Sequence, residues 1–268
     1  MTVLHPVTDR VLIHRSDFCA SNTTVVLGPA GTVLLVDPGV SRVELDQLAA
    51  LLRRSRLTVV AGVSTHPHWD HLLWHRDWGA VCRYAAGAAG ELVGRTHGEL
   101  VRQAEQAVPG SGRRLWPGLT SLTEPDAPTG TQMLLAWDGP PVRILEHRAH
   151  APGHLALLVE TEGVLLAGDM LSDSEIPLLD LDAADPVGDY LRALRLMEDL
   201  PGVRSVIPGH GSVGDAGQLR RRIAADRTYL RGLGDAAEVT DPRLGPPAAD
   251  WMVREHHAQR ALARGEMR

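Results

Sequence analysis

The sequence predicts an α/β fold in which two mixed β-sheets pack face to face with helices on both outer faces, a four-layer αββα sandwich. In each half, short apolar runs broken by Gly and Pro are followed by amphipathic segments. The second half repeats this order without any repeat at the level of residues. At 268 residues and 44% hydrophobic composition, the chain can build one large core. We therefore expect a single domain over 1–268.

The first half begins with strands and then turns into a helix. GPAG forms the turn between the second and third strands, and PG at 38–39 ends the third. Ser41 can cap the following helix, in which leucines recur at helical spacing. A further helix is expected to open at Asp70. The predicted strands are 11–15, 23–28, 32–37, 57–65 and 80–86, and the first helix is 41–55.

The middle of the chain, 87–140, has no apolar pattern strong enough for a core of its own. Within it, 91–108 is typical of a helix, and 109–130 is rich in Pro and Gly and predicts a long loop. We interpret 87–140 as an insertion that forms a lid or wall on the substrate side, since lids commonly define specificity.

The second half returns to strands and ends in helices. A hairpin is predicted around the turn at Glu162 and Gly163. Its strands are 141–147, 155–161, 164–169 and 203–211, and its helices are 186–200, about 215–233 and 249–264. The last two make 215–268 a helical C-terminal region.

Composition excludes several classes of protein. No apolar run approaches the ~18 residues that cross a bilayer, and no secretory leader is evident, so we expect a soluble cytoplasmic protein without a membrane partner. The net charge of −6 opposes binding to nucleic acid. All 27 basic residues are Arg, which with abundant Ala, Gly and Leu favours a bacterial gene. Cys19 and Cys82 are too few for a disulfide framework. A homodimer is compatible with the sequence.

The chemistry is concentrated in HPHWDH, residues 66–71, directly after a buried strand. In extended chain, residues two apart point the same way, so His66 and His68 can hold one ion together. Asp70 and His71 follow where the chain turns and can face a neighbouring position. Imidazole and carboxylate suit Zn²⁺, with Fe or Mn as alternatives.

Three further predicted strand ends carry metal-capable residues beside Gly. They are HAPGH at 150–154, GDM at 168–170 and PGHG at 208–211. Convergence of these ends would add one His of HAPGH, Asp169 and His210 to the first motif. That set is sufficient for two metal ions with a bridging carboxylate and a bridging hydroxide.

HxHxDH followed in order by His, Gly-Asp and Pro-Gly-His resembles the metallo-β-lactamase fold superfamily. Asn22 before a hairpin that ends in VDPG, 36–39, adds to the resemblance, which covers about residues 10–215. It implies the four-layer αββα fold and a dinuclear centre holding two Zn²⁺. Asp169 at the bridging position favours the glyoxalase II- or lactonase-like branch over true β-lactamases.

The resemblance also implies individual roles. His66, His68 and His150 would hold the first metal, Asp70, His71 and His210 the second, and Asp169 would bridge. Asp70 would orient the nucleophile and pass a proton to the leaving group. Both histidines of HAPGH remain open as ligands; we favour His150, with His154 hydrogen-bonding behind the site.

Residues around the motif are candidates for support or for the substrate pocket. Asp37 is expected to tie the strand-end loops together. Where many relatives have glycines after HxHxDH, this sequence has Leu-Leu-Trp. Trp69 and Trp74 are therefore pocket candidates, although packing in the core is favoured for Trp74 and Trp78.

The predicted function is hydrolysis of an ester, lactone or thioester bond of a small molecule by a metal-bridging hydroxide. Two enzymatic alternatives remain: a mononuclear-iron oxidoreductase similar to persulfide dioxygenases, and a phosphodiesterase. A metal-binding scaffold is the non-enzymatic alternative. Arg220, Arg221 and Arg222 could imitate the basic region of glutathione-thioester hydrolases, but a solvated helix face is favoured.

Overall fold

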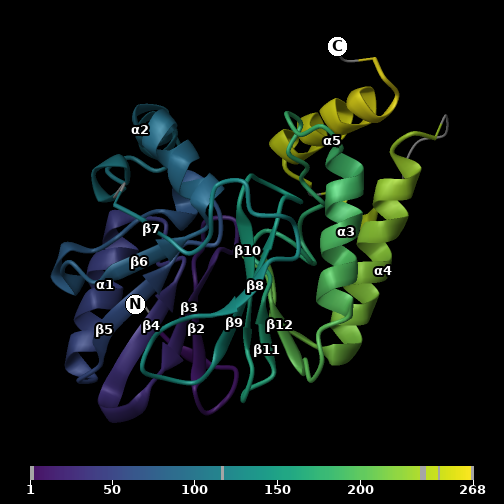
Figure 1. Ribbon diagram of the computed structural model, residues 1–268. Coiled ribbons are helices and arrows are strands. Elements are labelled where there is room, and N and C mark those ends of the chain that lie inside the picture. The colour runs from purple at the N-terminus through teal and green to yellow at the C-terminus, as the bar shows by residue number, and fades with distance from the viewer. Residues whose placement is uncertain (1–2, 116–117, 236–239, 247, 267–268) are drawn as a thin grey trace.

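The computed structural model describes residues 3–115, 118–235, 240–246 and 248–266. In these residues, two β-sheets pack face to face with helices outside (Figure 1), which confirms the predicted fold class. The first sheet has the spatial order β1-β2-β3-β4-β5-β6-β7, with strands β1 (His5–Pro6), β2 (Val11–Arg15), β3 (Asn22–Leu27), β4 (Thr32–Val36), β5 (Thr58–Val63), β6 (Cys82–Ala85) and β7 (Thr120–Ser121).

The second sheet has the order β13-β12-β11-β10-β9-β8. Its strands are β8 (Gln132–Leu134), β9 (Val142–His147), β10 (His154–Val159), β11 (Val164–Leu166), β12 (Ser205–Ile207) and β13 (Gly214–Asp215). The α-helices are α1 (Arg42–Arg54), α2 (Gly87–Ala107), α3 (Pro186–Glu198), α4 (Ala216–Gly232) and α5 (Asp250–Ala263). Single 3₁₀ turns occur at η1 (Pro29–Gly31), η2 (Trp69–His71), η3 (Arg76–Trp78), η4 (Gly112–Arg114) and η5 (Pro242–Leu244).

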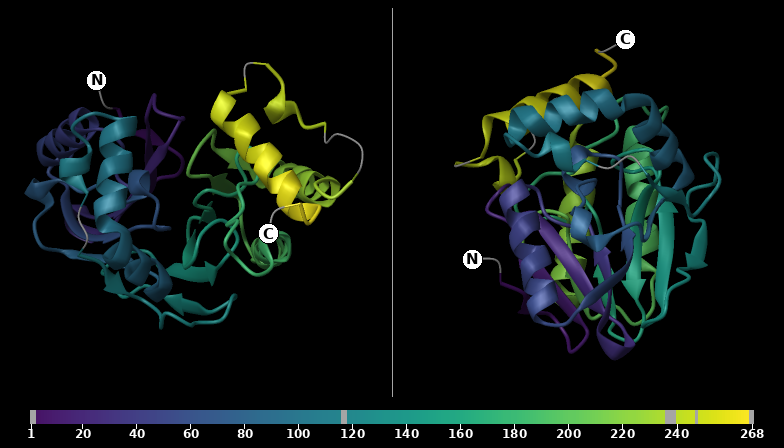
Figure 2. Two further views of the ribbon diagram at one scale, coloured as in Figure 1. Left: turned by 90° about the horizontal axis from the view of Figure 1, so that it is seen from above. Right: turned by 90° about the vertical axis from the view of Figure 1, so that its left-hand side faces the viewer.

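The core lies in three layers that match the four-layer arrangement. Apolar side chains of β2–β5 meet those of β9–β11 between the sheets. A second cluster joins the outer face of the first sheet to α1, and a third joins the second sheet to α3 and α4. Seen from above, α2 and α5 lie on opposite sides of the molecule (Figure 2).

The local structure differs from the predictions at several positions where the chain forms turns or short elements. The helix expected at Asp70 is one 3₁₀ turn, Trp69–His71, which brings His71 back toward the sheet edge. The predicted loop 109–130 contains β7, which pairs with β6, and η4. The strand predicted at 203–211 ends at Ile207, and the Pro-Gly-His segment follows as a turn. The Ser41 cap is confirmed as a capping box with Glu44.

Four segments that follow strands β5, β9, β11 and β12 carry the motif residues. Strands β11 and β12 are parallel neighbours, so their carboxyl ends lie at the same edge of the second sheet. Strand β5 delivers HPHWDH to this edge from the first sheet. Among the described residues, no helix is long and apolar enough to span a membrane.

Candidate metal centre

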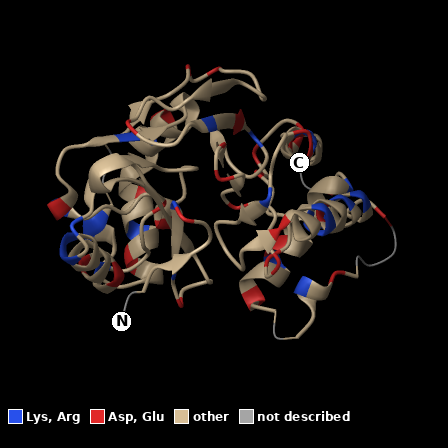
Figure 3. Ribbon diagram, turned by 90° about the horizontal axis from the view of Figure 1, so that it is seen from below, with Lys and Arg blue, Asp and Glu red and all other residues tan. Residues whose placement is uncertain are grey.

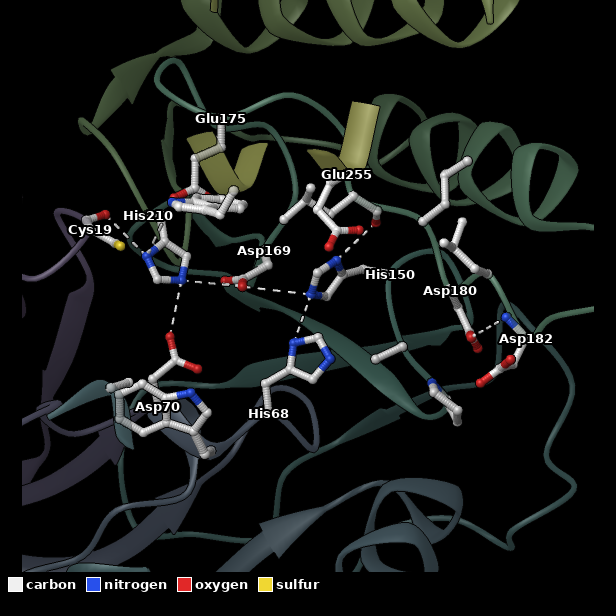
Figure 4. A pocket seen from close by; sticks show the side chains of 18 of the residues that line it. Cys19, His68, Asp70, His150, Asp169, Glu175, Asp180, Asp182, His210 and Glu255 are labelled. Carbon is white, nitrogen blue, oxygen red and sulfur yellow. Dashed lines mark hydrogen bonds and ion pairs between the residues drawn. The ribbon is translucent and has the colours of Figure 1, made fainter. Parts of the chain in front are cut away.

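The structure brings seven of the predicted site residues together in two groups. The first group is His66, His68, His150 and Asp169, and the second is Asp70, His71 and His210. Within each group, one potential ligand atom per residue lies within 4.8 Å of all the others. Figure 4 shows Asp169 between His210 and His150.

His150 presents an unprotonated nitrogen to the first group. Its Nδ1 lies 2.9 Å from the carbonyl oxygen of Leu178, which can only accept, so Nδ1 carries the proton. In neutral imidazole, Nε2 then has a free lone pair, and this atom lies 3.0 Å from His68 Nδ1.

His66 also directs an unprotonated Nε2 at the first group, because its Nδ1 is held by a hydrogen bond. The Thr65 hydroxyl donates to Asp37 Oδ2 at 2.6 Å, so its oxygen accepts from His66 Nδ1 at 3.0 Å. His66 Nε2 is therefore also unprotonated and lies 3.1 Å from His68 Nδ1. His68 Nδ1 has at most one proton to share between two facing lone pairs. Three nitrogens in this arrangement are satisfied together by a cation.

The second group is held from the other side of the centre. His210 Nδ1 lies 3.1 Å from the carbonyl oxygen of Cys19 and 3.2 Å from Ser21 Oγ. The proton on Nδ1 leaves Nε2 facing two carboxylate oxygens, Asp70 Oδ2 at 3.3 Å and Asp169 Oδ2 at 3.2 Å. Because the lone pair on Nε2 would face two negatively charged oxygens, a positive charge is again required between them.

His71 completes the second group. Its Nδ1 lies 3.0 Å from Asp37 Oδ2, and its Nε2 lies 3.5 Å from Asp70 Oδ2 and 3.3 Å from Asp169 Oδ1. Asp37 also accepts hydrogen bonds from the backbone and hydroxyl of Thr65. Asp37 thus ties the end of β4 to the segment after β5.

The pKa directions divide the histidines by their surroundings. Burial is the largest effect on His66, His68 and His150 and lowers the pKa of each, to about 3 for His68. Burial also opposes charge on His71 and His210, but the nearby carboxylates, Asp169 above all, raise their pKa well above the usual value. The three imidazoles of the first group are therefore neutral, whereas the carboxylates around His71 and His210 favour a positive charge in the second group.

These residues fit divalent metal ions. His71 Nε2 and Asp169 Oδ1 are buried, lie 3.3 Å apart and have no hydrogen-bond partner among the described residues. Converging imidazole nitrogens and carboxylate oxygens are the donor set that Zn²⁺, Mn²⁺ and Fe²⁺ accept. A metal ion would satisfy these orphaned atoms and the facing lone pairs at once.

His154 lies behind the centre rather than in either group. Its Nε2 accepts a hydrogen bond from the backbone N–H of Asp169 at 3.1 Å, and its Nδ1–H faces His147 Nε2 at 3.0 Å. His147 lies directly opposite His154 in the β9–β10 pair. His147 belongs to none of the motifs in the sequence, and its position at the end of a predicted strand was the available signal.

Asn22 fixes the loop that carries His210. Its side-chain amide donates to the carbonyl oxygens of Pro208 and Gly211 at 2.9 and 3.0 Å. Cys19 and Ala20 adopt positive φ angles, and this turn aims the Cys19 carbonyl at His210.

A cavity of about 830 Å³ opens over the centre. Trp69 lines it, whereas Trp74 does not: Trp74 and Trp78 are buried together beside α1, with ring centroids 4.8 Å apart. The predicted insertion contributes Leu92 and Ala107 of α2 to the wall. Sequence reasoning missed the other wall, which comes from the segment 175–182 and from α5. These segments lack a motif that could have identified them.

Comparisons with known proteins agree with this geometry. A family model described as the metallo-beta-lactamase superfamily matches residues 16–210, well over half of the chain. Among solved structures, the DIM-1 metallo-beta-lactamase is similar at a TM-score of 0.63 and 19% identity, covering 83% of this chain and 95% of that one.

Two further structures give the same result. A metallo-beta-lactamase from Pontibacter korlensis has a TM-score of 0.59 and 16% identity, with 84% of this chain and 98% of that one covered. One from Hirschia baltica has a TM-score of 0.58 and 15% identity, with 83% and 96% covered. A comparison with curated protein sequences found no significant match. By the family model, the ordered motif and the sandwich that carries it, the chain belongs to the metallo-β-lactamase superfamily.

Proposed function

We propose that the protein is a hydrolase with two divalent metal ions, zinc in the first instance, that cleaves an ester, lactone or thioester bond of a small molecule. His66, His68 and His150 would hold one ion, and Asp70, His71 and His210 the other. Asp169 would contact both ions. This extends the superfamily's metal-dependent hydrolytic character to a specific number of ions and a class of bond.

The position of Asp169 is the observation that carries the proposal. Its Oδ2 lies 3.4 Å from His66 Nε2 and 3.6 Å from His150 Nε2, both in the first group. The same carboxylate reaches the second group, at 3.3 Å from His71 Nε2 and 3.2 Å from His210 Nε2. A single carboxylate in contact with both groups is the arrangement that a shared ligand requires.

The residues divide the chemical work. Divalent ions, when bound, would polarise the oxygen of the scissile bond and activate water for attack. Asp70 lines the cavity, so its carboxylate can orient the attacking water and then carry a proton to the leaving group. The carbonyl oxygens of Leu178 and Cys19 accept hydrogen bonds from the Nδ1–H groups of His150 and His210, and this keeps both Nε2 atoms directed at the centre.

The arginines that could bind the glutathione part of a thioester do not face the cavity. Arg220 and Arg221 are exposed on α4, and Arg222 donates to the carbonyl oxygens of Leu171 and Ser212. None of the three lines the cavity. Because the structural neighbours are named metallo-beta-lactamases at under 20% identity, β-lactams belong in a substrate panel as a comparison.

The test combines metal analysis with a panel of esters, lactones, thioesters and β-lactams. Protein purified without added metal should contain two divalent ions per chain and turn over at least one acyl class. Asp169→Asn and His210→Ala should each lower kcat/KM by about 10³-fold or more. Asp9→Asn, an exposed carboxylate elsewhere, serves as the matched control.

Three results would contradict the proposal. A metal-replete protein inert toward the whole panel is not this hydrolase. One iron per chain, with oxygen consumption on a persulfide, would assign the redox alternative. A biological role that survives His210→Ala would assign a scaffold.

A further inference from the structure

The cavity above the metal centre has an apolar body. Leu92 of α2 lies on one side, and Leu178, Leu181 and Trp251 line the other. Phe18 and Trp69 meet edge to face with ring centroids 5.5 Å apart and form an aromatic wall beside the centre. Such a wall accepts a hydrocarbon and also attracts a cation to its ring faces.

The floor of the same cavity is the metal centre. Asp169 lines it, its side chain is 7% exposed, and its Oδ1 has no hydrogen-bond partner among the described residues. The reacting bond of a substrate would lie here, and the rest of the molecule must extend along the walls.

Apart from the histidines, the ionisable carboxylate and guanidinium side chains that line this cavity are all carboxylates. Beyond the metal-centre residues, Glu175, Asp180, Asp182 and Glu255 line it, and no Arg of the described residues does (Figure 4). The chain has no Lys at all. Among the described residues, Asp180, Asp182 and Glu255 form no ion pair with a basic side chain.

Several carboxylates elsewhere in the molecule are paired with arginines. At the N-terminal end of α3, close to this wall in sequence, the capping residue Asp185 and the helix residue Asp189 pair with Arg192 at 3.0 and 2.7 Å. Glu198 pairs with Arg227 at 2.7 Å. Figure 3 shows acidic and basic residues interspersed over the helices. The cavity wall that carries Asp180, Asp182 and Glu255 has carboxylates and no Arg side chain among the described residues, so a cation would be attracted to this wall and an anion repelled from it.

We propose that the substrate is an ester, lactone or thioester with an apolar body and a positively charged amine, and that the cavity discriminates against anions. The amine would lie against Asp180, Asp182 and Glu255 while the reacting bond lies over Asp169. This inference rests on the proposed hydrolase function and names its substrate class. It disfavours substrates that carry a carboxylate on that body, for the same physical reason.

The test measures binding separately from turnover. Three carboxamides of equal chain length, ending in trimethylammonium, its neutral isostere tert-butyl, or carboxylate, resist hydrolysis. Their Kd for the metal-loaded protein can be followed by fluorescence of Trp69 and Trp251, which line the cavity. We expect the cation to bind about 10-fold more tightly than the neutral isostere and the carboxylate to bind more weakly than both.

A matched pair of triple variants locates the effect. Asp180→Asn, Asp182→Asn and Glu255→Gln together should remove the preference for the cation. Asp9→Asn, Asp235→Asn and Glu266→Gln change the net charge equally at exposed positions away from the cavity and should keep it.

Equal Kd values for the three carboxamides, or an equal loss of preference in both triple variants, would overturn the inference. The corresponding esters separate it from the proposed function. If neutral and anionic esters are cleaved as fast as cationic ones, the proposed hydrolase function stands and the inferred preference for cations is wrong. If the carboxamides bind in the expected order but no ester is cleaved, the binding preference stands and the proposed hydrolase function is wrong.

Discussion

The backbone N–H of Asp169 donates a hydrogen bond to Nε2 of His154, at 3.1 Å. The carboxylate that contacts both metal-binding groups is thus positioned through its own backbone by a histidine outside those groups. His154 Nδ1 faces His147 Nε2 at 3.0 Å, so the imidazole is fixed from both sides. Gly168, at φ +54, leaves room for this ring, since a Cβ there would overlap it.

His154→Ala should weaken metal binding without removing a ligand. The Asp169 N–H loses its acceptor, and we expect a 10- to 100-fold loss in metal affinity, as for other groups that support ligands. Competition with a chromophoric chelator measures this. His154→Gln retains an acceptor and should recover part of the affinity. Equal affinity of His154→Ala and wild type would show that His154 only fills space.

Gly209→Ala should displace Asp169 directly. A Cβ at position 209 would overlap Asp169 Oδ1 and approach the Gly168 carbonyl carbon to 3.1 Å. We expect loss of bound metal and a fall in kcat of about 10²-fold or more, because small misplacements at a reacting centre are costly. Gly94→Ala in α2, where a Cβ meets nothing within 4 Å, is the control and should leave metal content unchanged. Normal metal content in Gly209→Ala would contradict this.

Gln259→Met should alter substrate binding but not metal content. Gln259 Oε1 accepts from the Leu179 backbone at 2.7 Å, and its amide donates to Tyr229 Oη at 2.9 Å. This anchors the cavity wall to the C-terminal helices. Loss of both bonds leaves buried groups unsatisfied at a cost of about 1–3 kcal/mol, and KM should rise more than kcat falls.

The exposed Gln103→Met is the matched substitution for that experiment. It should change neither KM nor the free energy of unfolding by a measurable amount. A lower metal content in Gln259→Met would mean that the anchor supports the centre rather than the cavity wall.

Glu44 should make the free energy of unfolding depend on pH. Burial opposes its ionisation, but hydrogen bonds from His14, Ser16 and Ser41 prevail and lower its pKa to about 2. The folded-state pKa lies below the unfolded value near 4.5, so ionised Glu44 stabilises above pH 4.5. That contribution is lost as the pH falls from 4.5 toward 2.

Glu44→Gln should therefore destabilise the protein by about 1–2 kcal/mol at pH 7, allowing for partial solvent screening. Urea unfolding of both proteins at pH 7, 5 and 3 measures the difference, which should shrink over the lower two values. Asp9→Asn, at an exposed position, controls for surface charge. A difference independent of pH would assign the effect to packing instead.

Short-range pattern and donor chemistry were enough to predict the fold and most of the centre. HPHWDH combines a strand alternation with a turn, and the other strand ends place His or Asp beside Gly, so the sequence alone predicted the seven residues that the structure brings together. Which of the two histidines of HAPGH lies among the potential metal ligands is decided only by the structure. The β9–β10 turn directs His150 to His68, whereas His154 begins a strand and lies under Gly168.

What only the tertiary structure decided is the cavity. Its acidic wall comes from 175–182, which has no regular secondary structure, and from one face of α5, some 70 residues further along the chain. Neither segment has a sequence pattern from which its neighbours in the folded structure could be predicted. Metal ligands are recognisable because their chemistry demands particular atoms at particular spacings. The charge and shape of a binding cavity depend instead on which distant segments pack beside one another.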